Sequence, residues 1–243
     1  MRTIYWYLNF VVTLVLKTPE LLTMKKKSES MKTLDFYSLI NKTAQKWAML
    51  QIKASGGTFH VLGNENIPKD EPVLFVSNHQ GNFDIAIFLS LIDKDKAYIA
   101  KIEILKIPLL RTWMKYLGCI FMDRSDMKKS AQAILEGINT LKSGYSLVIF
   151  PEGTRSKSDK TNEFKSGSLK LATKSKATIV PVTISGSYKL MEANNNRIKP
   201  AEVFITIHKP IKTSELTQEQ LIELPKKVEE VICSALPLSK SQD

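Results

Sequence analysis

The chain has 243 residues, of which 43% are hydrophobic and 24% charged, a composition that supports one sizeable core and argues against wholesale disorder. Its formal net charge of +11 indicates polyanionic partners, such as nucleic acid, anionic lipid or phosphorylated metabolites. Two cysteines lie far apart without a CxxC pair or a His/Cys cluster, which argues against a disulfide scaffold and a structural zinc site and favours a reducing, cytosol-facing compartment.

The first 56 residues combine basic and apolar side chains. They hold nine Lys/Arg and three Asp/Glu, so more than half of the net charge lies here. Residues 3–16 read TIYWYLNFVVTLVL, an apolar run shorter than the roughly 20 residues that span a bilayer. Two alternatives are a buried core helix and a cleaved signal peptide, although no small-x-small cleavage site follows the run. The pattern favours a helix embedded at a membrane surface.

A second helix is predicted over residues 34–52, after Pro19 and lysines 25–27 interrupt the chain. It has an apolar stripe with lysines beside it, and two glycines end it. A solvated face is an equal explanation for lysines 25–27 taken alone. We expect residues 1–56 to form a two-helix membrane-anchoring motif and residues 57–243 to form the second domain.

From Gly57 onward, short β-rich runs alternate with helical patterns. Strands are predicted over 58–62, 73–77, 97–100, 119–122, 146–150, 178–184 and 202–208, and helices near 85–92, 108–117, 128–142, 168–174 and 215–236. This alternation predicts an α/β fold whose largely parallel central sheet of about seven strands has helices on both faces. In such sheets, functional groups gather beyond the carboxyl ends of the strands.

The first loop of this kind, residues 78–84 (NHQGNFD), contains a candidate catalytic pair. His79 and Asp84 have four residues between them, so a turn and a first helical turn can bring the carboxylate onto one imidazole nitrogen. The other nitrogen can then remove a proton from an alcohol as a general base. It is equally open that Asp84 caps the helix and His79 is an ordinary loop histidine. His60 and His208 fall in strand patterns and are interpreted as structural or surface groups.

The second loop, residues 150–156 (FPEGTRS), has the features of a phosphate site. Gly153 permits close backbone approach, Thr154 offers a hydroxyl, and Arg155 offers a planar fork suited to phosphate. Glu152 can orient Arg155 or bind a glycerol hydroxyl. Taken alone, the motif also fits an ordinary Pro-Glu-Gly turn.

Together the two loops resemble the glycerolipid acyltransferase superfamily, whose members carry an N-H-x4-D block and an F-P-E-G-T-R-S block. The similarity is greatest to 1-acylglycerol-3-phosphate acyltransferases. Residues 118–124 (GCIFMDR) and 179–184 (IVPVTI) resemble two further blocks of that family in order and spacing. Gly81 departs from the pattern, because many relatives have Ser or a larger residue there.

The resemblance implies a role for each matching residue. His79 is expected to be the base and Asp84 its orienting partner. The residues expected to bind the acceptor and its phosphate are Arg124, Glu152, Gly153, Thr154, Arg155 and, more loosely, Lys101. No cofactor and no metal are implied.

The resemblance also implies a reaction and its partners. A fatty acyl group is expected to move from acyl-carrier protein or acyl-CoA to the free sn-2 hydroxyl of 1-acyl-sn-glycerol 3-phosphate (lysophosphatidic acid), giving phosphatidic acid without an acyl-enzyme. The enzyme would work on a phospholipid bilayer, at the cytosolic face of the cell inner membrane, and would not bind nucleic acid.

Three alternatives are open. One is an acyltransferase for glycerol 3-phosphate or another lysolipid. The second is a lipid or thioester hydrolase, against which no Gly-x-Ser-x-Gly elbow occurs. The third is a non-enzymatic basic binding protein, against which no recognised nucleic-acid motif occurs.

Overall fold

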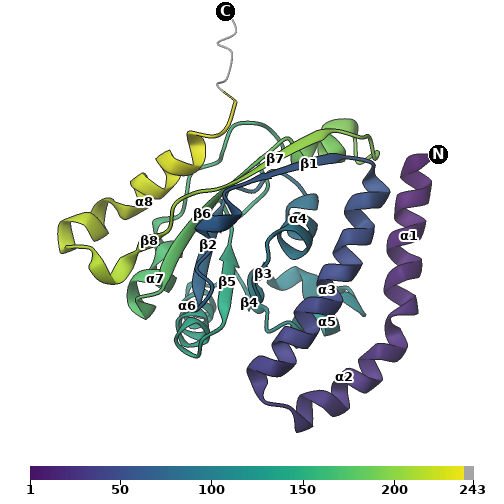
Figure 1. Cartoon of the computed structure of the whole chain (residues 1–243), viewed down its shortest axis with the longest axis horizontal. Helices are drawn as coiled ribbons and strands as arrows, with labels where there is room; N and C mark the ends of the chain where they lie inside the picture. Colours follow the sequence, from purple (N-terminus) through teal and green to yellow (C-terminus); the bar gives the residue numbers. More distant parts are fainter. Residues whose placement is uncertain (238–243) are drawn as a thin grey trace, which may run out of the picture.

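An eight-stranded sheet organises the chain (Figure 1). The structure is a computed structural model that describes residues 1–237, so the last six residues of the predicted second domain lie outside the described residues. The strands are β1 (Thr58–Leu62), β2 (Val73–Ser77), β3 (Lys96–Lys101), β4 (Ile120–Met122), β5 (Ser146–Ile149), β6 (Thr178–Ser185), β7 (Glu202–Ile207) and β8 (Ile211–Lys212). All seven predicted strands are present within two residues at either end.

The sheet is largely parallel, as the sequence predicts. Strand order is β1-β7-β6-β2-β5-β3-β4, and the five neighbours from β6 to β4 pair in parallel. β7 and the two-residue β8 run antiparallel to β6, and β1 pairs in parallel with β7. Every residue of β2, β5 and β6 is buried, because helices cover both faces of the sheet centre.

Helices form a layer on each face of the sheet. They are α4 (Phe83–Leu91), α5 (Leu110–Tyr116), α6 (Met127–Lys142), α7 (Lys170–Ser175) and α8 (Gln218–Cys233). Figure 1 shows α4 and α5 on the side of the N-terminal helices, and α6, α7 and α8 on the other side. α4 lies between α3 and the sheet, which explains why almost all of its side chains are apolar.

The N-terminal segment forms three helices rather than the two predicted: α1 (Arg2–Leu16), α2 (Thr18–Ser30) and α3 (Thr33–Ser55). Pro19 does not interrupt the chain as a breaker, because it occupies the first turn of α2, where its missing N–H costs no hydrogen bond. Lysines 25–27 continue the same helix. α3 ends at Gly56, which has the left-handed φ of 73° that suits glycine.

α1 has one docked face and one exposed face. On the docked face, Trp6 is 8% exposed, its ring lies 5.2 Å from that of Phe83 and its Nε1–H donates to the Gln51 carbonyl at 3.1 Å. The exposed large apolar side chains of α1 are Ile4, Tyr5, Tyr7, Leu8, Val11, Val12, Val15 and Leu16. No helix within residues 1–237 combines the length and apolar character needed to cross a membrane.

The chain passes from helices to sheet at Gly56 and Gly57, where the sequence predicts a domain boundary. Side chains of α1 and α3 nevertheless belong to the same core as the strands. The division into two domains therefore stays a prediction.

Candidate active site

Four of the predicted site residues follow neighbouring parallel strands. His79 follows β2, Gly153 follows β5, Lys101 ends β3 and Arg124 follows β4. Since the order is β2-β5-β3-β4 and adjacent strands lie about 4.8 Å apart, these residues line one edge of the sheet. This is the carboxyl edge, where the sequence places them.

His79 and Asp84 contact each other directly. The imidazole Nδ1 lies 2.7 Å from Asp84 Oδ2. The Asp84 side chain has no exposed area, whereas the His79 side chain is 18% exposed. With Nδ1–H donating to the carboxylate, Nε2 is the nitrogen left to accept a proton. The pair therefore has the geometry of a tethered general base.

The Asp84 carboxylate also organises the loop around the histidine. Its Oδ2 accepts from the backbone N–H groups of Gln80 at 2.7 Å and Gly81 at 2.9 Å. Its Oδ1 accepts from the Ser187 hydroxyl, at the start of a short 3₁₀ helix, η4 (Ser187–Leu190). These partners all lie outside α4, so Asp84 orients the imidazole and fixes the loop and does not cap the helix that carries it.

Side chains of the loop tie it to β6. Asn78 exchanges two hydrogen bonds of 2.8 Å with the backbone of Ile184, and the side-chain Oε1 of Gln80 accepts from Gly186 N–H at 2.8 Å. Both side chains are buried. The His79 ring stacks on Phe150 with centroids 4.2 Å apart, so the imidazole is held from a second side.

Glu152 lies under the site with both carboxylate oxygens occupied. Oε1 accepts from His79 N–H at 2.6 Å and Oε2 accepts from Asn162 N–H at 2.7 Å. Burial raises the pKa of this carboxyl group, opposed by those two hydrogen bonds. Its partners are backbone groups of two loops, and it does not orient Arg155, which was one expectation from the sequence.

Arg155 is oriented instead by Glu192, in the short 3₁₀ helix η5 (Glu192–Asn194). Its Nη1 lies 3.1 Å from Glu192 Oε1 and also donates to Asn82 Oδ1. Glu192 Oε1 accepts a further hydrogen bond from Asn82 N–H at 2.8 Å. The guanidinium of Arg155, in the loop after β5, is thereby linked to the loop that carries His79.

Arg124 approaches the backbone of the Gly153 turn. A β-carbon built on Gly153 would lie 3.0 Å from Arg124 Nη1, and Gly153 has a left-handed φ of 75°. Burial lowers the pKa of Arg124 and the Glu103 carboxylate opposes that shift, but a guanidinium remains charged. Lys101 pairs with the same Glu103 at 3.8 Å, whereas Thr154 is exposed in the turn.

The other histidines lie away from this edge. His60 stacks on Phe204 in the outer strands, and His208 Nε2 lies 2.8 Å from the Thr183 hydroxyl, with a pKa lowered by burial. The described part of the chain has no group of three or more His, Cys, Asp or Glu side chains that could hold a metal ion.

Ser187, Glu192, Asn78 and Gln80 were not predicted as site residues. Asn78 and Gln80 flank His79. Their amide side chains directly after a buried strand were the sequence feature that could have identified them as site residues. Ser187 follows β6 at the same edge as the other loops. No sequence pattern pointed to Glu192, because it lies outside the four blocks that resemble the acyltransferase family.

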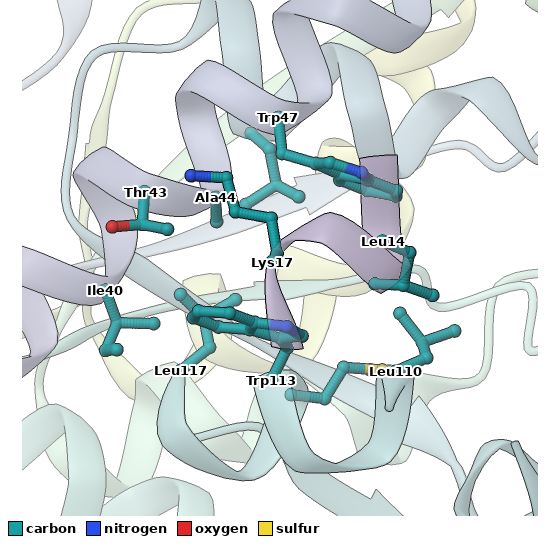
Figure 2. A pocket seen from close by; sticks show the side chains of 11 residues that line it. Leu14, Lys17, Ile40, Thr43, Ala44, Trp47, Leu110, Trp113 and Leu117 are labelled. Carbon is teal, nitrogen blue, oxygen red and sulfur yellow. The ribbon is translucent and has the colours of Figure 1, made fainter. Parts of the chain in front are cut away.

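An apolar pocket opens beside α1. Six of the side chains that line it are Leu14, Ile40, Trp47, Leu89, Trp113 and Leu117. Figure 2 shows the rings of Trp47, from α3, and Trp113, from α5, bordering this pocket, with Leu14 of α1 beside them. Lys17 is the one charged residue of the lining, so the pocket suits a hydrocarbon.

The chain is similar to known acyltransferases. A model of the acyltransferase family matches residues 58–185. The chain is 35% identical over 174 residues to a chloroplastic 1-acyl-sn-glycerol-3-phosphate acyltransferase of Arabidopsis thaliana, covering 71% of this chain and 48% of that protein. It is 34% identical over 167 residues to the 1-acyl-sn-glycerol-3-phosphate acyltransferase of Borreliella burgdorferi, covering 68% of this chain and 67% of that protein. The chain thus spans about half the length of the plant relatives it matches.

The fold is shared with a solved structure. The crystal structure of the 1-acyl-sn-glycerophosphate acyltransferase PlsC from Thermotoga maritima superposes with a TM-score of 0.82 at 32% sequence identity. The superposition covers 96% of this chain and 92% of that one.

Proposed function

Because the chain belongs to the acyltransferase family, we propose that it transfers a fatty acyl group from a carrier thioester to the free sn-2 hydroxyl of 1-acyl-sn-glycerol 3-phosphate. The observation that carries the proposal is the contact of 2.7 Å between His79 Nδ1 and a fully buried Asp84. Known relatives with the names given above support the choice of substrate.

His79 acts as the general base. Its Nε2 accepts the proton of the sn-2 hydroxyl while that oxygen attacks the thioester carbonyl. A carbon–oxygen bond forms, the carbon–sulfur bond breaks, and the proton passes from the imidazolium to the departing thiolate. The buried Asp84 carboxylate stabilises the imidazolium between these steps. The acceptor is itself the nucleophile, so the reaction needs no acyl-enzyme.

The turn after β5 binds the acceptor. Arg124 and the bare backbone of Gly153 hold its phosphate, with Arg155, Thr154 and Lys101 at the same edge of the sheet. Arg155 uses one nitrogen for Glu192 and retains its other N–H groups for an anion. Glu152 serves as a positioning residue, because its oxygens hold the backbone of His79 and of the following loop.

The exposed apolar face of α1 seats the enzyme on the cytosolic face of the cell inner membrane. Leu8 is 61% exposed and Leu16 is 71% exposed, and the lysines of α2 and α3 add positive charge to the same N-terminal segment. Such a helix inserts into the headgroup region without spanning the bilayer. Leu8→Glu is expected to release the protein from anionic vesicles in a flotation assay, whereas Met127→Glu, at an exposed residue of α6, should not.

The pocket beside α1 receives an acyl chain. It is lined by apolar side chains of four helices, α1, α3, α4 and α5, and the other face of α1 is the one we assign to the membrane (Figure 2). Ala44→Leu places a larger side chain in it, and a shift of preference toward shorter acyl chains is the expected result. An unchanged chain-length profile would argue that the pocket is not used.

One assay tests the activity. Purified protein in mixed micelles is given labelled acyl-carrier protein or acyl-CoA thioesters with lysophosphatidic acid, glycerol 3-phosphate or other lysolipids, and products are identified by mass. Phosphatidic acid is expected from the wild type and none from His79→Ala. Free fatty acid without a new ester would identify a hydrolase, and near-normal transfer by His79→Ala would remove the histidine from the mechanism.

A further inference from the structure

Two cationic side chains converge on the turn after β5. A β-carbon placed on Gly153 would lie 3.0 Å from Arg124 Nη1 and 3.3 Å from Lys165 Nζ. Arg124 comes from the loop after β4, and Lys165 directly precedes the 3₁₀ helix η3 (Ser166–Leu169). Two cations from different segments of the chain therefore lie close to the backbone of Gly153.

The positive charge of this site has little compensation. Arg124 Nη1 is buried and has no hydrogen-bond partner among the residues that the structure describes. The acidic group that acts on Arg124 is Glu103, which is itself paired with Lys101. Two cations held this close repel each other unless an anion lies between them. Arg155 differs, because Glu192 balances its charge directly.

Lys165 is held beside the turn by its own backbone. Its N–H donates to the Pro151 carbonyl at 3.1 Å, which connects the start of η3 to the loop after β5. The neighbouring Phe164 is buried and anchors the same segment. The ammonium group is thus presented to Gly153 by a fixed backbone, and only its own side-chain torsions remain free.

We propose that Lys165 is a further acceptor-binding residue, which together with Arg124 binds the phosphate of lysophosphatidic acid over Gly153. This assignment rests on the proposed function. A phosphate monoester offers three strong acceptor oxygens, enough for a guanidinium N–H, an ammonium N–H and a backbone group at once. Arg124 supplies the directed N–H, and Lys165 supplies a point charge.

The same chemistry exists in the donor, since coenzyme A and the prosthetic arm of acyl-carrier protein also carry phosphate. The position of the site favours the acceptor. Gly153 and His79 follow adjacent strands, about 4.8 Å apart. In the acceptor, four bonds separate the sn-2 oxygen from the phosphorus, whereas in the donor a long pantetheine arm separates the thioester from its phosphate.

Lys165→Met tests the assignment in zwitterionic detergent micelles, where the loss of one surface charge does not alter delivery of the acceptor. The KM for lysophosphatidic acid is expected to rise about ten- to a hundredfold, with the KM for the donor unchanged. Lys165→Arg should recover part of the loss. Lys170→Met, at an exposed lysine on the adjacent helix α7, is the matched control and should behave as wild type.

An acceptor without a phosphate tests whether the effect of Lys165→Met depends on that group. With 1-acylglycerol, Lys165→Met and the wild type should react equally slowly, because no phosphate is there to bind. An unchanged KM for lysophosphatidic acid would overturn the proposal. A rise confined to the donor KM would also overturn it, by placing the donor phosphate at Lys165.

Direct binding separates failure of this proposal from failure of the proposed function. If the wild type transfers no acyl group to any acceptor, the proposed function is lost, yet titration calorimetry with glycerol 3-phosphate still probes the site. Weaker binding by Lys165→Met than by Lys170→Met supports the anion site, and equal binding by the two variants overturns it.

Discussion

Replacing Asp84 by Asn tests the proposed mechanism at its centre, because the structure allows the geometry to survive while the charge is lost. The carboxylate has no exposed area and receives three N–H donors on Oδ2 and the Ser187 hydroxyl on Oδ1. In Asp84→Asn, the amide oxygen can keep facing the three N–H groups. The amide nitrogen then donates to Ser187, whose hydroxyl rotates to accept.

The expected loss of activity in Asp84→Asn follows from the loss of the carboxylate charge alone. In the proposed mechanism His79 gains its positive charge by taking the proton of the acceptor, so the attraction of the carboxylate acts in the transition state and not before it. With about 4–5 Å between charge centres and an effective dielectric constant of about 20, that attraction is about 3–4 kcal/mol. Its loss corresponds to a fall in kcat of roughly 10²–10³-fold.

Initial rates measured over a range of acceptor concentrations give kcat and KM separately. We expect Asp84→Asn to lower kcat with little change in the acceptor KM, and thermal unfolding should confirm an intact fold. Ser187→Ala removes one hydrogen bond and no charge, so its loss should stay below about tenfold. If folded Asp84→Asn stays within tenfold of the wild type, Asp84 does not stabilise an imidazolium and the mechanism is wrong.

Three further predictions concern the loops and the core. In Gly153→Ala, the alanine must adopt the left-handed φ of 75° and its β-carbon points at Arg124 Nη1. We therefore expect kcat/KM for the acceptor to fall at least about tenfold in initial-rate assays, and retained activity would remove this turn from acceptor binding. Gly81→Ala would place a β-carbon 2.7 Å from Glu192 Oε2, so it should raise the acceptor KM in the wild type. In a Glu192→Ala background it should cost less, because only the contact of 3.3 Å with Tyr188 Cα remains; additive losses would contradict that coupling. Burial lowers the pKa of Lys96 to about 7 from 10.5, so the folded protein releases this proton at a lower pH than the unfolded chain does. The free energy of unfolding, measured by urea denaturation, should therefore rise between about pH 7 and 10.5 by at most about 1.4 kcal/mol per pH unit. An equal rise in Lys96→Met would show that other groups cause this pH dependence.

The body of the fold could be predicted because its local signals agree with its tertiary structure. β2, β5 and β6 are short apolar runs between turn residues, and they become the fully buried centre of the sheet. The two-residue strand β8 has too little sequence to form a pattern of its own and exists through its pairing with β6. α2 was missed for a different reason, since Pro19 breaks a helix interior but is tolerated in the first turn.

The catalytic pair could be predicted, and its supporting contacts could not. His79 and Asp84 lie five residues apart, so local turn geometry alone brings them together. Ser187 and Glu192 lie more than a hundred residues from the groups they contact in that loop, and only the position of β6 beside β2 brings them there. The contact expected between Glu152 and Arg155 does not form, because the partners of Glu152 are backbone N–H groups, which no sequence pattern reveals.

The packing of α1 connects the proposed membrane surface to the proposed base. Leu8 and its exposed neighbours lie on one face of this helix, and Trp6 on the other face packs against Phe83, the residue directly before Asp84. The contact of the Phe10 ring with that of Trp47 in α3, with centroids 5.2 Å apart, and the hydrogen bond from Trp6 to α3 fix this packing. If α1 binds the bilayer as we propose, the depth of the imidazole below the membrane surface is set by rigid side-chain packing and not by a flexible tether. A hydroxyl at the headgroup level would then meet the base without the acceptor leaving its leaflet.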